Sequence, residues 1–177
     1  MALSVVFETH ATTVDNETGR ATGWLPGELS AAGREQARQL GLRRREDDID
    51  AVCSSDLRRA VETSEIAFAG ASAPVLVDPR LRECNYGRLN GAAVGDLNVP
   101  EHLHDPYPDG ESWRQAADRV MSWLDDVRIR YDGQRILVIG HSVTKWALDE
   151  VVDNVALAES LASPFTWQPG WEYRLSR

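Results

Sequence analysis

The sequence has only two cysteines, Cys53 and Cys84, and their separation matches no spacing typical of a metal site. One disulfide between them is an alternative, but disulfides persist mainly in oxidising compartments. We therefore expect reduced thiols and a cytoplasmic protein, and the cysteines give no indication of a bound metal.

Positive charge is also scarce. The chain has 19 lysine and arginine residues against 28 aspartate and glutamate residues, which gives a formal net charge of −9, and Lys145 is the one lysine. No segment concentrates basic residues, which argues against a nucleic-acid or anionic membrane partner. Any phosphate that binds must therefore meet a local basic pocket on an acidic molecule.

Long hydrophobic segments are missing as well. No stretch reaches the ~20 apolar residues of a membrane span, and the first residues show no basic segment followed by an apolar run. We find no internal repeat, low-complexity segment or domain linker, and 177 residues is a length typical of one domain. The sequence thus predicts a single domain over residues 1–177 and no membrane partner.

What the chain does contain is an alternation of strand-like and helix-like segments. Short apolar runs predict strands at residues 3–8, 49–55, 73–81 and 135–141, and an edge strand at 171–176. Longer amphipathic segments predict helices at residues 31–45, capped by Ser30, at 57–70, opened by Asp56, and at 111–131 and 143–152. This order predicts a three-layer α/β sandwich, with a mainly parallel central sheet and helices on both faces.

Reactive side chains follow several of the predicted strands. His10 and His141, two of only four histidines, each come at the end of a strand. Arg59 lies in the first turn of the helix after the second strand, and Glu83 follows the third strand. Because ligands bind outside the carboxyl ends of the strands in open α/β sheets, we expect these four groups to meet in one crevice.

Such a set of groups suits phosphoryl transfer. An imidazole nitrogen held in line can attack phosphorus and form a phosphohistidine, which divides one displacement into two. Guanidinium and N–H donors stabilise the charge on the equatorial oxygens. A carboxylic acid such as Glu83 can protonate the leaving alkoxide and then activate water, if burial raises its pKa.

The order of these residues resembles the histidine phosphatase superfamily, in the branch that includes the cofactor-dependent phosphoglycerate mutases. Five blocks carry the resemblance over almost the whole chain: THATTVDNETGRATGWLPGELSAAG, SSDLRRAVET, LRECNYGRLNG, PDGESWRQAADRV and ILVIGHS. The resemblance implies a phosphoglycerate mutase-like fold and a small phosphorylated molecule as substrate. It implies no metal or organic cofactor, because phosphohistidine chemistry needs none.

The resemblance also implies roles for individual residues. His10 would be the nucleophile, Arg59 the phosphate-binding arginine, Glu83 the proton donor, and His141 the electrostatic partner of the phosphoryl group. Further positions that match contacts to phosphate or substrate are Asn16, Thr22 and Gly23.

Three positions beside the histidines depart from the family pattern. Thr9 stands where the family has arginine before the nucleophile, Ala11 where it has glycine, and Ser142 where glycine is common after the second histidine. We nevertheless expect Thr9 and Ser142 to lie at positions that contact the substrate or its phosphate. In other phosphoryl-transfer systems one arginine contributes ~10³–10⁵ in rate, or ~4–7 kcal/mol, so its loss should cripple an otherwise unchanged site.

Three interpretations of Thr9 follow. The protein is a phosphatase whose substrate needs less charge neutralisation, or in which another cation compensates; it catalyses a different reaction on a small molecule; or it is a pseudoenzyme that binds a ligand. The four retained groups favour hydrolysis of a small phosphorylated metabolite. The candidate compensating cations are Arg20, Arg58, Arg88 and Lys145, although Arg58 is better explained as a solvated helix residue.

Mutase activity is less expected than hydrolysis. The segment between Gly91 and Gly110 is short, and the mutases that this chain resembles have a longer insertion there, which shields phosphohistidine from water. Specificity is expected from residues 98–110 and 165–173. Candidate walls of the pocket are Trp24, Trp167 and Trp171, which could equally be core or subunit contacts, so a homodimer is one assembly that the sequence allows.

His102 and His104 match no catalytic position. With Asp105 they could bind a metal, but a solvated or substrate-facing loop is the expected environment, and no metal site is predicted.

Overall fold

In the computed structural model, which describes residues 1–176, five strands form one sheet in the order β3-β2-β4-β1-β5. The strands are β1 (Leu3–Thr9), β2 (Ala51–Ser54), β3 (Val75–Val77), β4 (Arg135–Gly140) and β5 (Trp171–Leu175). The first four run parallel, and β5 pairs antiparallel with β1 at one edge. The predicted mainly parallel sheet with an edge strand near the C-terminus is confirmed.

The inner strands alternate their side chains between two buried faces. In β1, Leu3, Val5 and Phe7 belong to the hydrophobic cluster on one face, and Val6 belongs to the cluster on the other. Strands β2 and β4 contribute to both clusters in the same way. Because both faces are buried, these strands are nearly continuous apolar runs in the sequence.

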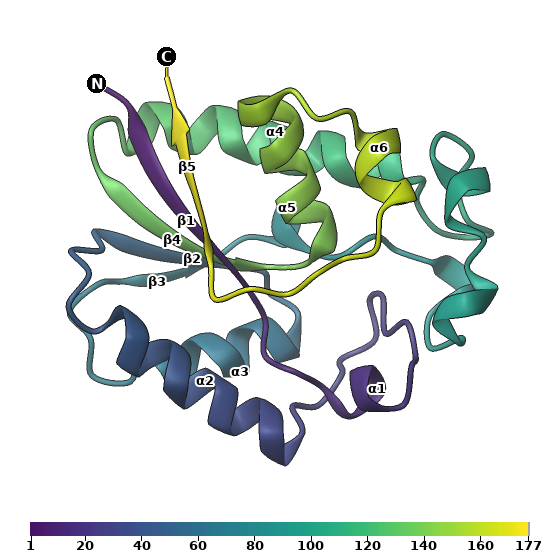
Figure 1. Cartoon of the computed structure of the whole chain (residues 1–177), viewed down its shortest axis with the longest axis horizontal. Coiled ribbons are helices and arrows are strands. Elements are labelled where there is room, and N and C mark those ends of the chain that lie inside the picture. Colours follow the sequence, from purple (N-terminus) through teal and green to yellow (C-terminus); the bar gives the residue numbers. More distant parts are fainter. Residues whose placement is uncertain (177) are drawn as a thin grey trace.

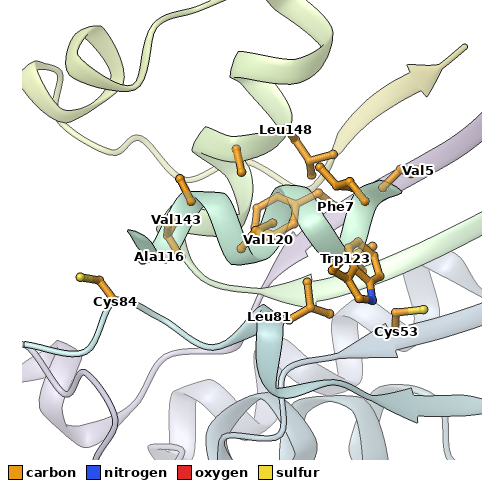
Figure 2. Packing of buried hydrophobic residues seen from close by; sticks show 14 of the residues in the cluster. Val5, Phe7, Cys53, Leu81, Cys84, Ala116, Val120, Trp123, Val143 and Leu148 are labelled. Carbon is orange, nitrogen blue, oxygen red and sulfur yellow. The ribbon is translucent and has the colours of Figure 1, made fainter. Parts of the chain in front are cut away.

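Helices cover both faces of the sheet (Figure 1). Helices α2 (Ala31–Arg44) and α3 (Arg58–Ala67) lie on one side, and α4 (Trp113–Arg130) and α5 (Ser142–Leu148) lie on the other. Figure 2 shows Val120 and Trp123 of α4 packed among Phe7, Leu81 and Leu148 in the larger cluster. The predicted three-layer arrangement is therefore confirmed. None of the described helices is both long and apolar enough to cross a membrane.

Ser30 caps α2 as predicted, and α4 has a serine cap that was not predicted. The Ser30 hydroxyl accepts a hydrogen bond from the Gly33 N–H, and Ser112 forms a reciprocal capping box with Gln115 at the start of α4. The predicted start of α3 is wrong. Its N-cap is Leu57, because the carboxylate of Asp56 accepts two hydrogen bonds from Arg82 and is not available to the helix.

Other local elements were not predicted. The segment between β1 and α2 contains the short helix α1 (Val14–Glu17), and α6 (Leu157–Ala162) follows a π-helical segment (Asp149–Asp153). Strand β3 is shorter than predicted because a 3₁₀ turn begins at Pro79, which has no N–H for the sheet. Between β3 and α4 the chain forms four 3₁₀ turns: Pro79–Leu81, Gly87–Leu89, Val94–Asp96 and Val99–His102.

Candidate functional site

The register of β1 and β4 places the two predicted histidines side by side. Thr9 pairs with Gly140, and these are the last residues of the two strands. The next residues are therefore His10 and His141, which leave the sheet at the same level. The His10 N–H donates to the Gly140 carbonyl at 3.0 Å, and the two imidazole centroids are 5.0 Å apart.

Arg59 connects the two imidazoles. It lies in the first turn of α3, and only 2% of its surface is exposed. Its Nε lies 3.3 Å from His10 Nε2, and its Nη2 lies 3.3 Å from His141 Nδ1. The guanidinium also donates to the carbonyls of Gly23 and Leu25, at 2.8 and 3.1 Å. These carbonyls hold one guanidinium against both histidines.

The hydrogen bonds assign a tautomer to each imidazole. His10 Nδ1 lies 2.8 Å from the Ala11 carbonyl, which can only accept, so Nδ1 carries the proton and Nε2 keeps its lone pair. In His141, Nδ1 accepts from Arg59, so Nε2 carries the proton. This His141 Nε2–H is buried and has no hydrogen-bond partner within residues 1–176. One ring thus offers a nucleophilic nitrogen, and the other offers an unused donor.

Burial keeps both imidazoles neutral. Desolvation, reinforced by the charge of Arg59, lowers the pKa of His10 to about 3. The same two causes, in the same order, lower the pKa of His141 well below its ordinary value of 6.5. At neutral pH the His10 lone pair is therefore free of a proton.

Glu83 has the opposite shift. Its carboxyl group is buried, and desolvation raises its pKa, although the Cys84 N–H and the charges of Arg59 and Arg119 act against this. A carboxyl group with a raised pKa is suited to give and take a proton near neutral pH.

Arg119 of α4 and Trp24 hold Glu83 in place through its backbone. The Glu83 carbonyl accepts from Trp24 Nε1 at 2.6 Å and from Arg119 Nη2 at 2.7 Å. Arg119 also forms an ion pair with Glu111, and the Arg82 guanidinium lies 4.6 Å from the centre of the Trp24 ring. Trp24, predicted as a wall of the pocket, therefore does not line the cavity but holds the backbone of Glu83. The sequence analysis missed Arg119, although it lies in one of the five blocks.

Three of these groups meet at a cavity with a volume of about 270 Å³, whereas the buried His141 is not among its described lining residues. Its lining includes His10, Arg59 and Glu83, which come from three separate parts of the chain. The structure also brings four further predicted positions to this cavity: Asn16, Thr22, Gly23 and Ser142.

Gly23 is required where it lies. Its φ of +54° is in the left-handed region, and a Cβ at this position would collide with Asn90 and Tyr86. Its two neighbours in the site are fixed by local hydrogen bonds. The Thr22 hydroxyl donates to the Asp15 carboxylate. The side-chain carbonyl oxygen of Asn16 accepts from the Thr13 N–H, so the Asn16 NH₂ group is the part of this side chain that can donate to a ligand.

Thr9 lies elsewhere. It lines a neighbouring hollow of about 580 Å³ beside α2, and His10 is the one predicted site residue that lines both spaces. Of the four candidate compensating cations, Arg20 alone is among the described residues that line the smaller cavity. The other three are engaged in ion pairs outside it: Arg58 with Glu28, Arg88 with Asp109, and Lys145 with Asp149.

The other predicted aromatic walls also lie outside this cavity. Trp167 lines the hollow beside α2, and Trp171 packs against Phe7. His102 stacks on Tyr107, and residues 1–176 contain no cluster of three side chains able to hold a metal. The apolar wall is instead formed by residues that were not singled out individually: Val94, Leu97, Val99, Trp113, Trp146, Leu161 and Phe165.

Comparison with known proteins identifies the family. The model of the histidine phosphatase superfamily, branch 1, matches residues 5–160. The chain belongs to this superfamily. A curated relative, the probable phosphoglycerate mutase GpmB of Escherichia coli, is 31% identical over 151 residues, which are 80% of this chain and 70% of that protein.

Solved structures of similar fold include named phosphatases. Bacillus stearothermophilus YhfR has a TM-score of 0.85 at 24% identity and covers 96% of this chain, and 90% of its own chain is covered. The α-ribazole phosphatase of Shigella flexneri has a TM-score of 0.82 at 22% identity, covering 98% and 94%. A mycobacterial glucosyl-3-phosphoglycerate phosphatase in complex with VO3 has a TM-score of 0.79 at 25% identity, covering 90% and 86%. The phosphoglycerate mutase-like fold is thereby confirmed, and relatives and neighbours include both phosphatases and a probable mutase.

Proposed function

We propose that this protein is a phosphomonoesterase that hydrolyses a small phosphorylated metabolite through a phosphohistidine on His10. One observation carries the proposal: the Arg59 guanidinium bridges two imidazoles, one with an unprotonated Nε2 that accepts from Arg59 Nε, and a second with a buried, unpartnered Nε2–H. A phosphoryl group bound at this guanidinium would lie beside both the nucleophile and the donor. A buried donor without a partner is rare in folded proteins unless a ligand satisfies it.

In the first step, the His10 Nε2 lone pair attacks phosphorus. The new N–P bond forms as the ester P–O bond breaks, and the electrons of that bond remain on the leaving oxygen. Glu83, whose pKa is raised by burial, gives the proton of its carboxylic acid form to this oxygen. The hydrogen bond from His10 Nδ1 to the Ala11 carbonyl keeps the ring aligned and stabilises the positive charge that develops on it.

In the second step, the Glu83 carboxylate takes a proton from water, and the resulting hydroxide-like oxygen attacks phosphorus. The N–P bond breaks, its electrons return to His10 Nε2, and inorganic phosphate leaves. Arg59 and the His141 Nε2–H stabilise the equatorial oxygens in both steps. Asn16 and Arg20, which also line the cavity, can add donors.

Hydrolysis is favoured over mutase activity by the small number of cations. A phosphoglycerate mutase has to hold a carboxylate as well as a phosphate. Beyond Arg59, Arg20 is the one described cation that lines the cavity, and its Nη1 already donates to the Gly91 carbonyl. A pseudoenzyme is disfavoured because Arg59 contacts both imidazoles, and because Arg59, Glu83 and His141 are buried while the half-buried His10 faces the cavity.

Phosphate release from a panel of phosphomonoesters tests the proposal. Wild-type protein should release phosphate, and His10→Ala should reduce turnover by about 10³-fold or more, as expected for a lost nucleophile. His104→Ala is the matched control, because this histidine is exposed and lies outside the cavity, and it should retain wild-type activity.

Rapid-quench labelling distinguishes the alternatives. With a ³²P-labelled ester, wild-type protein should carry acid-labile label that His10→Ala lacks, and the label should end in inorganic phosphate. Transfer of the label to a second hydroxyl of the substrate would show a mutase. Absence of both turnover and label across the panel would reject phosphoryl transfer and leave a different reaction or a ligand-binding role.

A further inference from the structure

The cavity lining contains two chemically different sets of side chains. One set is polar and includes the groups of the proposed reaction, His10, Arg59 and Glu83, together with Asn16. The other set is the apolar wall, which comes from segments that lie far apart in the sequence. The residues of this wall are Ala21, Tyr86, Val94, Leu97, Val99, Trp113, Trp146, Leu161 and Phe165.

From this wall we infer that the preferred substrates are monoesters of apolar alcohols, aromatic or alkyl, and not phosphorylated sugars or phosphorylated carboxylic acids. The inference rests on the proposed function, since it concerns the leaving group of that reaction. Phe165 and Trp146 are the specificity-determining residues that it identifies.

The aromatic part of the wall is continuous. The ring of Trp113 packs 5.1 Å from Trp146 and 5.7 Å from Tyr86, measured between centroids. Trp113 and Tyr86 are buried and fix the position of Trp146, which lies in α5 four residues after Ser142. A leaving group held there would meet flat apolar surfaces that are already in place, so little ordering would oppose binding.

The mouth of the cavity is apolar too. Val94 is 56% exposed and Phe165 is 38% exposed, and both line the cavity. Exposed apolar side chains gathered around a hollow typically mark a binding surface. A bound apolar group would cover both side chains and remove their surface from water.

Polar partners for a second functional group are few. Apart from His10, Asn16, Arg59 and Glu83, the polar side chains of the described lining are those of Arg20, Thr22, Ser142 and Ser163. The Thr22 hydroxyl is already engaged with Asp15, and Arg20 Nη1 with the Gly91 carbonyl. A sugar would place several hydroxyls against carbon, and each unpaired hydroxyl weakens binding by roughly tenfold. A carboxylate or second phosphate would depend on Arg20 in a protein with a net charge of −9.

The volume limits the size of the alcohol. A cavity of about 270 Å³ lies just below the range of ~300–1,000 Å³ typical of small-molecule pockets. Phosphate already fills part of this space. Alcohols the size of hexanol or 2-phenylethanol are therefore suitable probes.

Esters of matched intrinsic reactivity provide the test. We would compare kcat/KM for 2-phenylethyl phosphate and hexyl phosphate with that for glycerol 1-phosphate and 3-phosphoglycerate, all of which are esters of primary alcohols. The two apolar esters should exceed the two polar ones by about tenfold or more, because apolar surface is buried and no hydroxyl is left unpaired. Equal values, or a preference for the polar esters, would overturn the inference.

Variants assign the preference to the wall. Phe165→Ala should lower kcat/KM for 2-phenylethyl phosphate by about tenfold and change that for glycerol 1-phosphate less than threefold. Trp167→Ala is the matched control, since it removes an aromatic side chain from the same segment that lies outside this cavity. Equal losses on both esters in Phe165→Ala would instead indicate a general structural defect and count against the assignment.

Phosphonates separate this inference from the proposed function. If no ester is hydrolysed, the phosphatase proposal fails, but calorimetry can still compare 2-phenylethylphosphonate with 2,3-dihydroxypropylphosphonate. Tighter binding of the apolar phosphonate supports the apolar wall whatever the reaction. Equal or weaker binding overturns it.

Discussion

At the scale of single residues, the site depends on one guanidinium. Arg59 contacts both imidazoles, and no other guanidinium lies within hydrogen-bonding distance of either ring among the described residues. Thr9, which stands where the family has a second arginine, lines the adjacent hollow of about 580 Å³. An arginine at position 9 would therefore have room beside His10 without displacing a packed side chain.

Thr9→Arg should raise kcat/KM for a simple phosphate ester by at least about tenfold, because an added cation stabilises the charge of the transition state. The expected gain is below the ~10²–10³ of an evolved donor, since nothing holds the new side chain in place. Thr9→Gln is the control for size, with similar reach and no charge. A loss of activity in Thr9→Arg together with normal activity in Thr9→Gln would contradict the prediction and show that a positive charge at this position is harmful.

At the scale of elements, α4 does more than cover the sheet. Its residue Arg119 donates to the Glu83 carbonyl and to the carbonyls of Arg80 and Arg82, and it pairs with Glu111. The irregular segment after β3 does not pair with a strand, so its backbone carbonyls need other hydrogen-bond donors. The Arg119 guanidinium supplies these donors. The position of the proton donor in the proposed reaction is therefore set by a helix that contributes no group to the chemistry.

Arg119→Met should lower the free energy of unfolding by about 2–4 kcal/mol, because the Arg80 and Arg82 carbonyls lose this donor and the Glu111 carboxylate loses its ion pair. It should also shift the pH dependence of kcat, since Glu83 would be held less firmly and would lose a nearby positive charge. Urea denaturation and a pH profile measure the two effects.

Arg128→Met provides the comparison on the same helix. This arginine is 41% exposed and pairs with Asp125 on the surface, so its loss should cost less than about 1 kcal/mol and leave the pH profile unchanged. Equal effects of the two substitutions would contradict the assigned role of Arg119.

At the scale of the whole molecule, the buried imidazoles couple folding to pH. In the unfolded chain both histidines take up protons near pH 6.5, whereas in the folded protein the pKa of His10 is lowered to about 3 and that of His141 is also lowered. The unfolded state therefore binds more protons as the pH falls below 6.5, and the folded protein loses stability. Glu83, whose pKa is raised, acts in the opposite direction as the pH falls through its folded-state pKa.

Between pH 7.5 and pH 5.5, each of the two histidines should remove about 1 kcal/mol from the free energy of unfolding. Urea denaturation at intervals across this range measures the slope. His10→Gln should reduce the slope by about half, because one of the two titrating groups is gone. An unchanged slope in this variant would mean that His10 is protonated in the folded protein, contrary to the structure.

Some features of this protein follow from the sequence by itself. Apolar runs and amphipathic periods predicted the strands, helices and layers, because these patterns depend on local periodicity and burial. The grouping of His10, Arg59, Glu83 and His141 could be predicted because parallel strands bring their carboxyl ends to one edge. The family could be recognised because five short sequence blocks occur in the family's order along the chain.

Only the tertiary structure decided which side chains support the site and which face its cavity. Asp56 was expected to cap a helix but binds Arg82, and Trp24 was expected to line the pocket but holds the Glu83 carbonyl. The tautomers of the histidines, the clamp formed by Arg119 and the apolar wall around Trp146 likewise depend on contacts between distant segments. Local pattern does not encode such contacts, because they arise only when the layers pack and compete for the same polar groups.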